Sequence, residues 1–280
     1  MQAILGDYND LKITRFTESG AYLDGGDGME ILMPKRYTSA TMHPGDVVRV
    51  FVYLDQENRP VATTERPLAK VGEFACLTVA WLNRHGAFLK WGLMKDLFVP
   101  FSEQSVKMEK DHAYIIYIYV DEISGRIVGS SKLDRHISKH TESLQPRDEV
   151  EVLVYKQTDI GYKAIILGPN CEGLLYRNEV FRPLSYGDRL TAYVKKVRSD
   201  GNVDLVLQTA GRQHTEDFAV TLLRALQEKP NHFIALSDNS APEEIYNLFG
   251  VSKKTFKRAV GALYKERLIT ITDDGITLAN

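Results

Sequence analysis

The sequence predicts a multidomain, mainly β protein in which three tandem five-stranded barrels of the OB-fold type precede a C-terminal α+β domain. The main observation is a short glycine-containing motif that occurs three times, as SGAYLD at 19–24, HGAFLK at 85–90 and IGYKAI at 160–165. Copies separated by about 65 to 75 residues indicate a tandem array of one small module. The second observation is a change in hydrophobic period, from two to 3.6, near residue 210.

A second landmark follows each copy and shows that the modules share one plan. It is an aspartate before an apolar run: Asp46 in HPGDVVRVFVYL, Asp111 in EKDHAYIIYIYV and Asp188 in YGDRLTAYVKKV. A tandem array of small β modules favours a binding protein over an enzyme.

Five strands are expected in each module, because short alternating runs are separated by turn residues. Five short strands with a glycine in the second strand predict a small closed barrel of the oligonucleotide-binding type. The expected strands are 11–16, 21–24, 30–34, 47–54 and 61–64, then 74–82, 87–91, 97–100, 114–121 and 127–130, then 149–156, 162–167, 172–176, 189–197 and 203–208.

The C-terminal domain is predicted to contain three helices. Thr215 is expected to cap the first helix, which ends before Pro230. The second begins at Pro242 and ends at Gly250, because proline suits the first helical position and glycine the position after the last. The other expected elements are a helix capped by Ser252 that runs to Leu268 and a hairpin of ITIT and ITL that turns at 273–275.

Three helices and a terminal hairpin are typical of a winged helix, a relative of the helix-turn-helix. The connector 65–72 is short, whereas 132–148 is long, polar and expected to be partly helical. The expected domains are barrels at 1–66, 67–146 (with its trailing linker) and 147–210, and a winged helix at 211–280.

Composition limits the classes of partner and compartment. The net charge of −2 means that nucleic-acid binding must come from local basic patches. No stretch approaches the ~18 apolar residues of a membrane span, and the first residues do not resemble a secretion signal, so we expect a cytoplasmic protein without membrane contact. Cys76 and Cys171 lie in different modules without a nearby partner, which predicts neither a disulfide framework nor a zinc site.

The second module carries the best candidate binding site. Aromatic side chains beside the motif glycine can stack unpaired bases at about 1 to 3 kcal/mol per base, and lysines can meet phosphates. The alternative is that Phe88 and Trp91 merely fill the barrel. The candidate side chains are His85, Phe88, Lys90, Trp91 and Phe98.

These features resemble the RNA-binding repeat of ribosomal protein S-one. That repeat has an aromatic-Gly-small-aromatic strand, an acidic-Gly-aliphatic-aliphatic-His strand, a Gly-Asp turn and an Asp-rich turn before Gly-Arg-Ile. The second module matches most of this pattern, with Pro100 where the repeat has histidine. The resemblance implies RNA contacts by His85, Phe88, Asp121 and Arg126.

The first and third modules depart from the pattern. In the first, Tyr22 and Arg59 remain as candidate RNA contacts, while Ser19 and Pro34 replace an aromatic residue and the histidine. In the third, Ile160 and Lys163 replace both aromatic residues. Its candidate contacts are therefore one aromatic at the histidine position and three cations that substitute charge for stacking: Tyr176, Lys195, Lys196 and Arg198.

Three such repeats followed by a winged helix are similar to the bacterial conserved virulence factor B family. The resemblance implies a regulator of gene expression that binds RNA. We therefore expect a regulatory protein that binds single-stranded RNA by base stacking and phosphate contacts and acts post-transcriptionally.

The third predicted helix carries basic residues largely off its apolar stripe, which makes it a candidate recognition helix for DNA or RNA. The acidic turn at Asp273 and Asp274 opposes this interpretation, because it would face phosphate. The candidate contacts are Lys253, Lys254, Lys257 and Arg258.

Enzyme, metal and cofactor functions have little support. The sequence lacks Gly-x-Ser-x-Gly, a phosphate-binding loop and His-Glu-x-x-His, so we expect no catalytic residues and no cofactor. His136 and His140 have helical spacing, but such a pair usually lies on an exposed polar helix. Two alternatives to RNA binding stay open: a protein-interaction scaffold, and a DNA-binding transcription regulator that acts through its winged helix.

Overall fold

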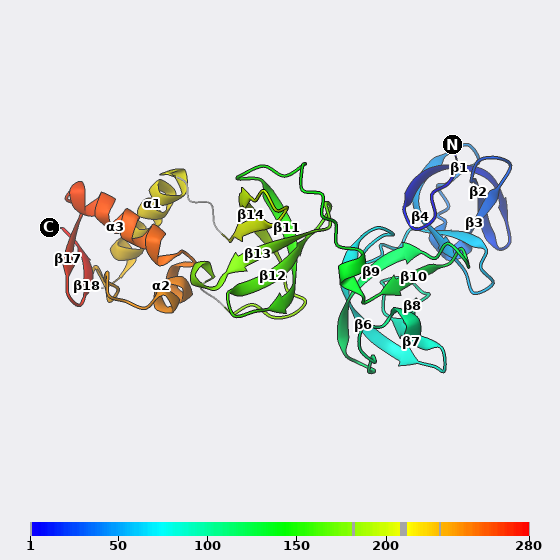
Figure 1. The fold of residues 1–280 in the computed structure, drawn as a ribbon. Helices are drawn as coiled ribbons and strands as arrows, with labels where there is room; N and C mark the ends of the chain where they lie inside the picture. Colours follow the sequence, from blue (N-terminus) through cyan, green and yellow to red (C-terminus); the bar gives the residue numbers. More distant parts are fainter. Residues whose placement is uncertain (1, 181–182, 208–211, 230, 280) are drawn as a thin grey trace. The chain divides into compact units, whose positions relative to one another are not determined.

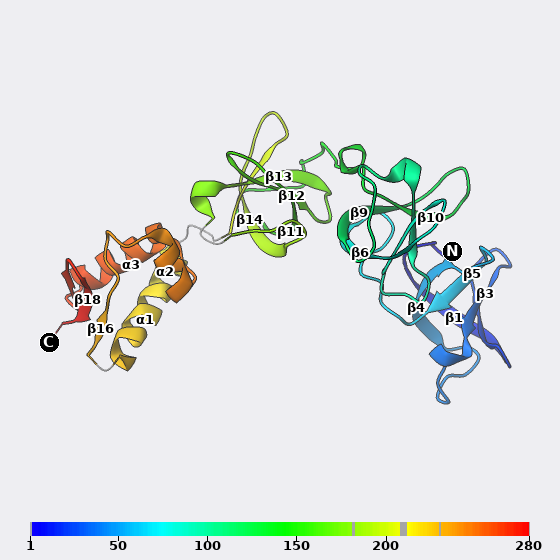
Figure 2. The same ribbon diagram turned by 90° about the horizontal axis from the view of Figure 1, so that it is seen from below.

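The computed structural model describes residues 2–180, 183–207, 212–229 and 231–279. The chain divides into two compact units, residues 1–137 and 138–280. The first unit holds two β-barrels, and the second holds a third barrel and a small α+β domain (Figure 1 and Figure 2). The predicted fold class is therefore confirmed.

The three barrels repeat one topology. The order of neighbouring strands in the first barrel is β1-β2-β3-β5-β4, and the others repeat it. The third and fifth strands run parallel and close each barrel, and the other neighbours are antiparallel. The bounds are β1 Tyr8–Thr17, β2 Gly20–Asp24, β3 Glu30–Pro34, β4 Val47–Leu54 and β5 Pro60–Thr63; β6 Phe74–Leu82, β7 Gly86–Leu89, β8 Leu97–Pro100, β9 Ala113–Val120 and β10 Ile127–Ser130; β11 Glu149–Gln157, β12 Gly161–Ile166, β13 Cys171–Tyr176, β14 Arg189–Val197 and β15 Val203–Val206.

A short 3-10 helix follows the third strand of each barrel, at Lys35–Tyr37, Phe101–Glu103 and Arg177–Glu179. The long connector 132–148 contains one more, Leu133–Arg135. Its expected helical content is thus limited to these three residues.

The motif glycine is explained by the close approach of the neighbouring strand. A Cβ atom at Gly20 would lie 2.1 Å from the carbonyl oxygen of Met33, and one at Gly86 would lie 2.3 Å from that of Val99. Contacts this short exclude any side chain. The third copy is the same, because Gly161 faces the carbonyl oxygen of Leu175 at 2.1 Å.

The first and second barrels share a hydrophobic core. The ring of Trp91 meets Phe51 of the first barrel edge to face, with centroids 5.7 Å apart, and its indole N–H donates to the carbonyl of Ala69 at 2.7 Å. At the same junction, Lys70 forms an ion pair with Asp7 at 2.9 Å. The two barrels therefore meet through buried aromatic rings as well as polar contacts.

The C-terminal domain has three helices and a three-stranded sheet of order β16-β18-β17. The Ser252 hydroxyl accepts a hydrogen bond from the Thr255 backbone N–H at 3.1 Å, so its predicted capping role is confirmed. Gly250 has a φ of 68° and ends the second helix as expected. The elements are α1 Arg212–Glu228, β16 Phe233–Ile234, α2 Pro242–Phe249, α3 Lys253–Lys265, β17 Ile269–Thr272 and β18 Gly275–Leu278.

Three local expectations need correction. Thr215 lies inside α1, which is described from Arg212 onward, so it is not the N-cap. Helix α3 ends at Lys265 rather than Leu268, because Arg267 has a left-handed φ of 58°. Strand β16 was not expected, since two residues give no readable period. The expected end of the last strand of the third barrel, residue 208, and the expected domain boundary at 210 lie outside the described residues. Among the described residues, no helix is long and apolar enough to cross a membrane.

Candidate nucleic-acid interface

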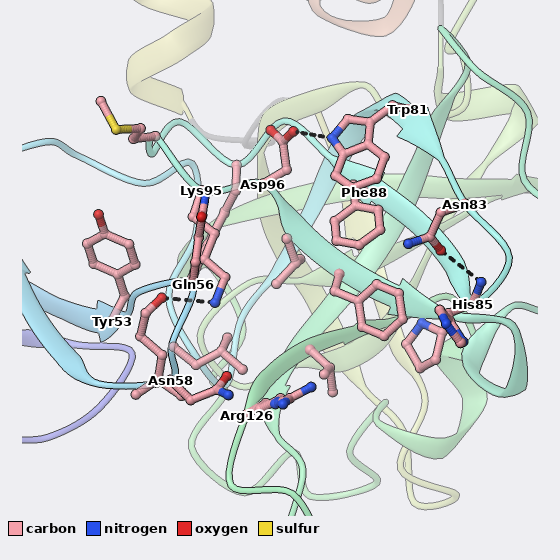
Figure 3. Close-up of a pocket in the computed structure, with 18 residues that line it drawn as sticks. Tyr53, Gln56, Asn58, Trp81, Asn83, His85, Phe88, Lys95, Asp96 and Arg126 are labelled. Carbon is pink, nitrogen blue, oxygen red and sulfur yellow. Dashed lines mark hydrogen bonds between the residues drawn. The ribbon is translucent and has the colours of Figure 1, made fainter.

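Three aromatic side chains form a continuous row on one face of the second barrel. Trp81 of β6 stacks on Phe88 of β7, with ring centroids 3.7 Å apart and planes inclined by 3°. Phe88 also meets Phe98 of β8 at 4.9 Å and 36°. The Trp81 ring is 45% exposed, and its N–H donates to an Asp96 carboxylate oxygen at 2.9 Å, which fixes its orientation (Figure 3). We call Trp81, Phe88 and Phe98 the aromatic row.

A β-bulge in the first strand of each barrel creates the position that Trp81 occupies. The bulge adds one residue, which turns the next side chain to the other face of the strand. That next residue pairs across the sheet with the second residue after the motif glycine. The resulting pairs are Arg15 with Tyr22, Trp81 with Phe88, and Lys156 with Lys163.

Trp91, which the sequence grouped with the stacking residues, does not have that role. It is only 3% exposed, because its ring fills the junction between the first two barrels. Trp81 takes the exposed position instead, and sequence reasoning missed it. Strict alternation from the buried Leu77 and Val79 points Trp81 inward, and only the bulge between Val79 and Trp81 reverses this direction.

A half-open groove of about 870 Å³ runs beside the aromatic row. One wall comes from the second barrel, and the other comes from the β4–β5 turn of the first barrel (Figure 3). Sequence reasoning did not predict this second wall, because it depends on how the two barrels meet. Besides the row, the polar and aromatic residues that line the groove include Tyr53, Gln56, Asn58, Asn83, His85, Lys95, Asp96 and Arg126.

The loop before β7 brings His85 to the rim of this groove. The side-chain oxygen of Asn83 accepts hydrogen bonds from the backbone N–H groups of His85 at 2.8 Å and Gly86 at 3.1 Å. The side chain of His85, which the resemblance to the RNA-binding repeat gives as an RNA contact, is exposed here. Pro100, which stands where that repeat has histidine, pairs with Gly86 across the strands and also lines the groove.

The predicted polar contacts of the second barrel divide into two groups. Arg126 is exposed and lines the groove. Lys90 is exposed, and Asp121 shapes the β9–β10 turn, but neither lines the groove. The Asp121 carboxylate accepts hydrogen bonds from the backbone N–H (2.9 Å) and the hydroxyl (2.5 Å) of Ser124, which lower the pKa of Asp121. Arg126 is therefore the predicted cation best placed for a phosphate in the groove.

Lys95 connects the two walls. Its ammonium group donates to the backbone carbonyls of Leu54 at 3.1 Å and Asp55 at 2.7 Å in the first barrel. Burial lowers the pKa of Lys95, and the nearby charge of Arg126 lowers it further. Lys95 thus links the two walls of the groove. Its ammonium group is already hydrogen-bonded and is not free to bind a ligand.

The candidate residues of the first barrel already contact other side chains of the same barrel. The Arg15 guanidinium lies 3.9 Å above the centroid of the Tyr22 ring and forms an ion pair with Glu30 at 2.6 Å. Arg59 forms ion pairs with Asp55 at 2.8 Å and with Glu57. One face of Tyr22 and the charge of Arg59 therefore have intramolecular partners.

The third barrel shows the same pattern of internal pairing. Arg198 forms an ion pair with Asp204 at 2.7 Å and a hydrogen bond with the Tyr176 hydroxyl. Lys195 forms an ion pair with Glu179 at 2.5 Å. Lys196 is exposed, and no ion pair involves it in the described part of the chain. Of the predicted cations of this barrel, Lys196 is thus the most available.

In the C-terminal domain, the four predicted basic contacts on α3 fall into two pairs. Lys253 donates to the carbonyl of Ser240 at 2.8 Å, and Lys257 forms an ion pair with Asp238 at 3.2 Å. Lys254 and Arg258 are exposed, and neither has a side-chain partner within the described ranges. They lie four residues apart and so share one face of the helix.

Within the described part of the chain, other reactive groups do not gather into a second site. No cluster of three or more histidine, cysteine or acidic residues suited to a metal occurs among the residues described. Burial raises the pKa of Cys171 to about 11, so its thiol stays protonated. His136 does not share an exposed helix with His140, because its ring stacks on Tyr117 with centroids 4.2 Å apart.

Comparison with known proteins matches both ends of the chain to domain families. Residues 5–65 match the S1 domain, and residues 220–278 match the CvfB-like winged helix domain. The protein YitL of Bacillus subtilis is 27% identical over 270 residues, which cover 93% of this chain and 89% of YitL. Conserved virulence factor B of Staphylococcus aureus is 21% identical over 285 residues, or 98% of this chain and 94% of that protein.

Among solved structures, a multidomain protein with nucleic acid binding domains from Streptococcus pneumoniae aligns over 98% of both chains, with 24% identity and a TM-score of 0.43. The matched S1 domain is the first of three barrels with one strand order, and the matched winged helix follows them. The resemblance of this chain to the conserved virulence factor B family is therefore confirmed.

Proposed function

We propose that this protein binds single-stranded RNA through the aromatic row and the adjoining groove, and that it regulates gene expression post-transcriptionally without catalysing a reaction. The observation that carries the proposal is the stack of Trp81 on Phe88, half exposed beside a groove that also contains Arg126. Flat rings and a cation on one surface are what unpaired nucleotides require.

The geometry of the row indicates where a base would stack. The face of Phe88 toward Trp81 is covered, because the two rings are parallel at 3.7 Å. The other side of Phe88 meets Phe98 at 4.9 Å, so the exposed part of Trp81 is the surface left for a base. Each stacked base contributes about 1 to 3 kcal/mol, and only unpaired bases can present their faces. The row therefore favours single strands over duplexes.

The charge distribution supports a local binding site. With a net charge of −2, the chain has no general attraction for phosphate. Arg126 in the groove and Lys90 outside it are exposed, whereas Arg59, Lys195 and Arg198 are neutralised by acidic neighbours. Binding is thus centred on the second barrel, with the C-terminal domain contributing through Lys254 and Arg258.

The S1 domain match and the likeness to conserved virulence factor B proteins support a regulatory role in the cytoplasm. The test is fluorescence anisotropy of the full chain with labelled single-stranded RNA, duplex RNA and duplex DNA across a salt series. Tightest, salt-sensitive binding to single-stranded RNA is expected. Tightest binding to duplex DNA would favour a transcription regulator. No binding to any probe at micromolar concentration, together with a stoichiometric protein partner, would favour a scaffold.

A further inference from the structure

We propose that the β4–β5 turn of the first barrel is the base-selecting wall of the groove, and that the amides of Gln56 and Asn58 hydrogen-bond the edges of bases stacked on the aromatic row. This inference rests on the proposed function and deepens it. It assigns specificity to the first barrel and stacking to the second, and it makes adenine the preferred base.

The turn has a fixed backbone. The Asp55 carboxylate accepts hydrogen bonds from the backbone N–H groups of Glu57 at 2.8 Å and Arg59 at 2.9 Å, and from the Arg59 guanidinium at 2.9 Å. Asn58 has a left-handed φ of 62°, and its N–H donates to the Asp55 carbonyl at 3.1 Å. These bonds fix the backbone of the turn and therefore the positions of the Cα atoms of Gln56 and Asn58.

The turn is also fixed to the barrel that carries the aromatic row. Lys95 lies between β7 and β8 and donates to the carbonyls of Leu54 and Asp55, at the start of the turn. Both walls belong to the same compact unit, residues 1–137. A nucleotide in the groove therefore meets the row on one side and the turn on the other (Figure 3).

The two amides are available for a ligand. Gln56 and Asn58 are exposed and line the groove, and within the described ranges neither side chain hydrogen-bonds to another residue. In the β14–β15 turn of the third barrel, the same backbone hydrogen bonds join Arg198 and Asn202, so Ser199 and Gly201 stand at the positions of Gln56 and Asn58. The turn of the third barrel therefore carries no amide at either position.

The chemistry of the wall favours adenine. An amide offers a donor beside an acceptor, and asparagine or glutamine pairs with adenine through two hydrogen bonds. Guanine instead presents two adjacent acceptors, O6 and N7, which arginine or lysine reads with two donors and which one amide cannot meet together. The amides of Gln56 and Asn58 therefore match the donor and acceptor of adenine better than the paired acceptors of guanine.

The test compares three labelled RNA homopolymers of equal length, oligo(A), oligo(U) and oligo(C), with the full-length protein. Wild type is expected to bind oligo(A) most tightly. The double variant Gln56→Ala, Asn58→Gly is expected to lose about tenfold of that preference, in line with the discrimination of a paired amide. Glycine at position 58 tolerates the left-handed φ, so the turn is preserved. Glu57→Gln, in the same turn but outside the groove lining, is the matched control and is expected to keep the preference.

Equal affinity of wild type for the three homopolymers, or a preference that survives the double variant, would overturn the inference. An equal loss in Glu57→Gln would also overturn it, because the effect would then come from the turn as a whole. Phe88→Leu separates this inference from the proposed function. If the double variant changes only base preference while Phe88→Leu weakens all three probes, both stand. If Phe88→Leu binds as wild type does, the stacking platform itself is wrong.

Discussion

The indole of Trp81 lies parallel to the ring of Phe88 with centroids 3.7 Å apart, so the strand bulge of the second barrel produces an aromatic stack. At the same position the first barrel places Arg15 over Tyr22, and the third places Lys156 opposite Lys163. The same strand bulge therefore positions a different kind of side-chain pair in each barrel. In the second barrel it presents the ring of Trp81, a residue that is 45% exposed.

The fluorescence of Trp81 is expected to report RNA binding directly. The chain has two tryptophans, and Trp91 is buried. In a Trp91→Phe variant, Trp81 is the remaining fluorophore, and a base that stacks on its ring is expected to quench the emission upon titration with single-stranded RNA. The control is Trp81→Phe, in which the buried Trp91 remains and little quenching is expected. Equal quenching in both variants would contradict direct stacking on Trp81.

The salt dependence of RNA binding is expected to separate free from paired arginines. Arg126→Gln removes a cation in the groove, and loss of one phosphate contact lowers the slope of log K against log salt by about 0.7 for a single strand. Arg59→Gln is the control, since Arg59 is paired with Asp55 and Glu57. It is expected to leave the slope nearly unchanged. A larger change in Arg59→Gln than in Arg126→Gln would contradict the assignment.

The winged helix is expected to contact nucleic acid through Lys254 and Arg258, two of the four predicted basic contacts on α3. The double variant Lys254→Gln, Arg258→Gln is expected to lower the salt slope by about 1.4 for two lost phosphate contacts on a single strand. The matched control is Lys253→Gln, Lys257→Gln, which alters residues bonded to Ser240 and Asp238. Unchanged slopes in both double variants would show that α3 does not contact phosphate.

The stability of the first unit is expected to fall at mildly acidic pH because of His136. Its ring is stacked on Tyr117, and its Nε2 is buried without a hydrogen-bond partner among the described residues. Burial lowers the pKa of His136, although Glu103 opposes the shift; Arg135 adds to it. The unfolded chain, with a histidine pKa of about 6.5, therefore binds more protons than the folded chain just below that pH. The free energy of unfolding falls as pH drops through this range, and the loss ends below the folded pKa.

His136→Phe keeps an aromatic ring on Tyr117 without a titrating group. Urea unfolding followed by tryptophan fluorescence reports on the second barrel, since Trp81 and Trp91 both lie there. The midpoint of wild type is expected to decrease between about pH 7.5 and pH 5.5 more than that of the variant. Identical pH dependence in the two proteins would rule out His136 as the cause.

The barrels could be predicted from the sequence because their signals are local. Alternation marks the strands, and the motif glycine marks the place where β3 approaches Gly20 and β8 approaches Gly86 too closely for a side chain. Capping at Ser252 and the helix end at Gly250 are also local signals. The resemblance to the RNA-binding repeat also singled out His85, which the structure places in the groove lining.

The rest depends on contacts between distant residues. The outward direction of Trp81 requires a bulge that breaks the alternation, and the burial of Trp91 requires the neighbouring barrel. The second wall of the groove belongs to another module, so no motif within the second module could reveal it. Likewise, the ion pairs that neutralise Lys195 and Arg198 join different strands and turns of the third barrel.

The most direct measurement is the dissociation constant of Phe88→Leu for labelled single-stranded RNA, beside wild type and Tyr22→Leu. Leucine keeps the apolar volume but removes the flat ring, so the account predicts a loss of about 1 to 3 kcal/mol of binding free energy. Tyr22→Leu, in the first barrel where Arg15 covers the ring, is predicted to bind nearly as wild type does. Wild-type affinity in a folded Phe88→Leu protein would contradict the central claim that the aromatic row of the second barrel stacks RNA bases.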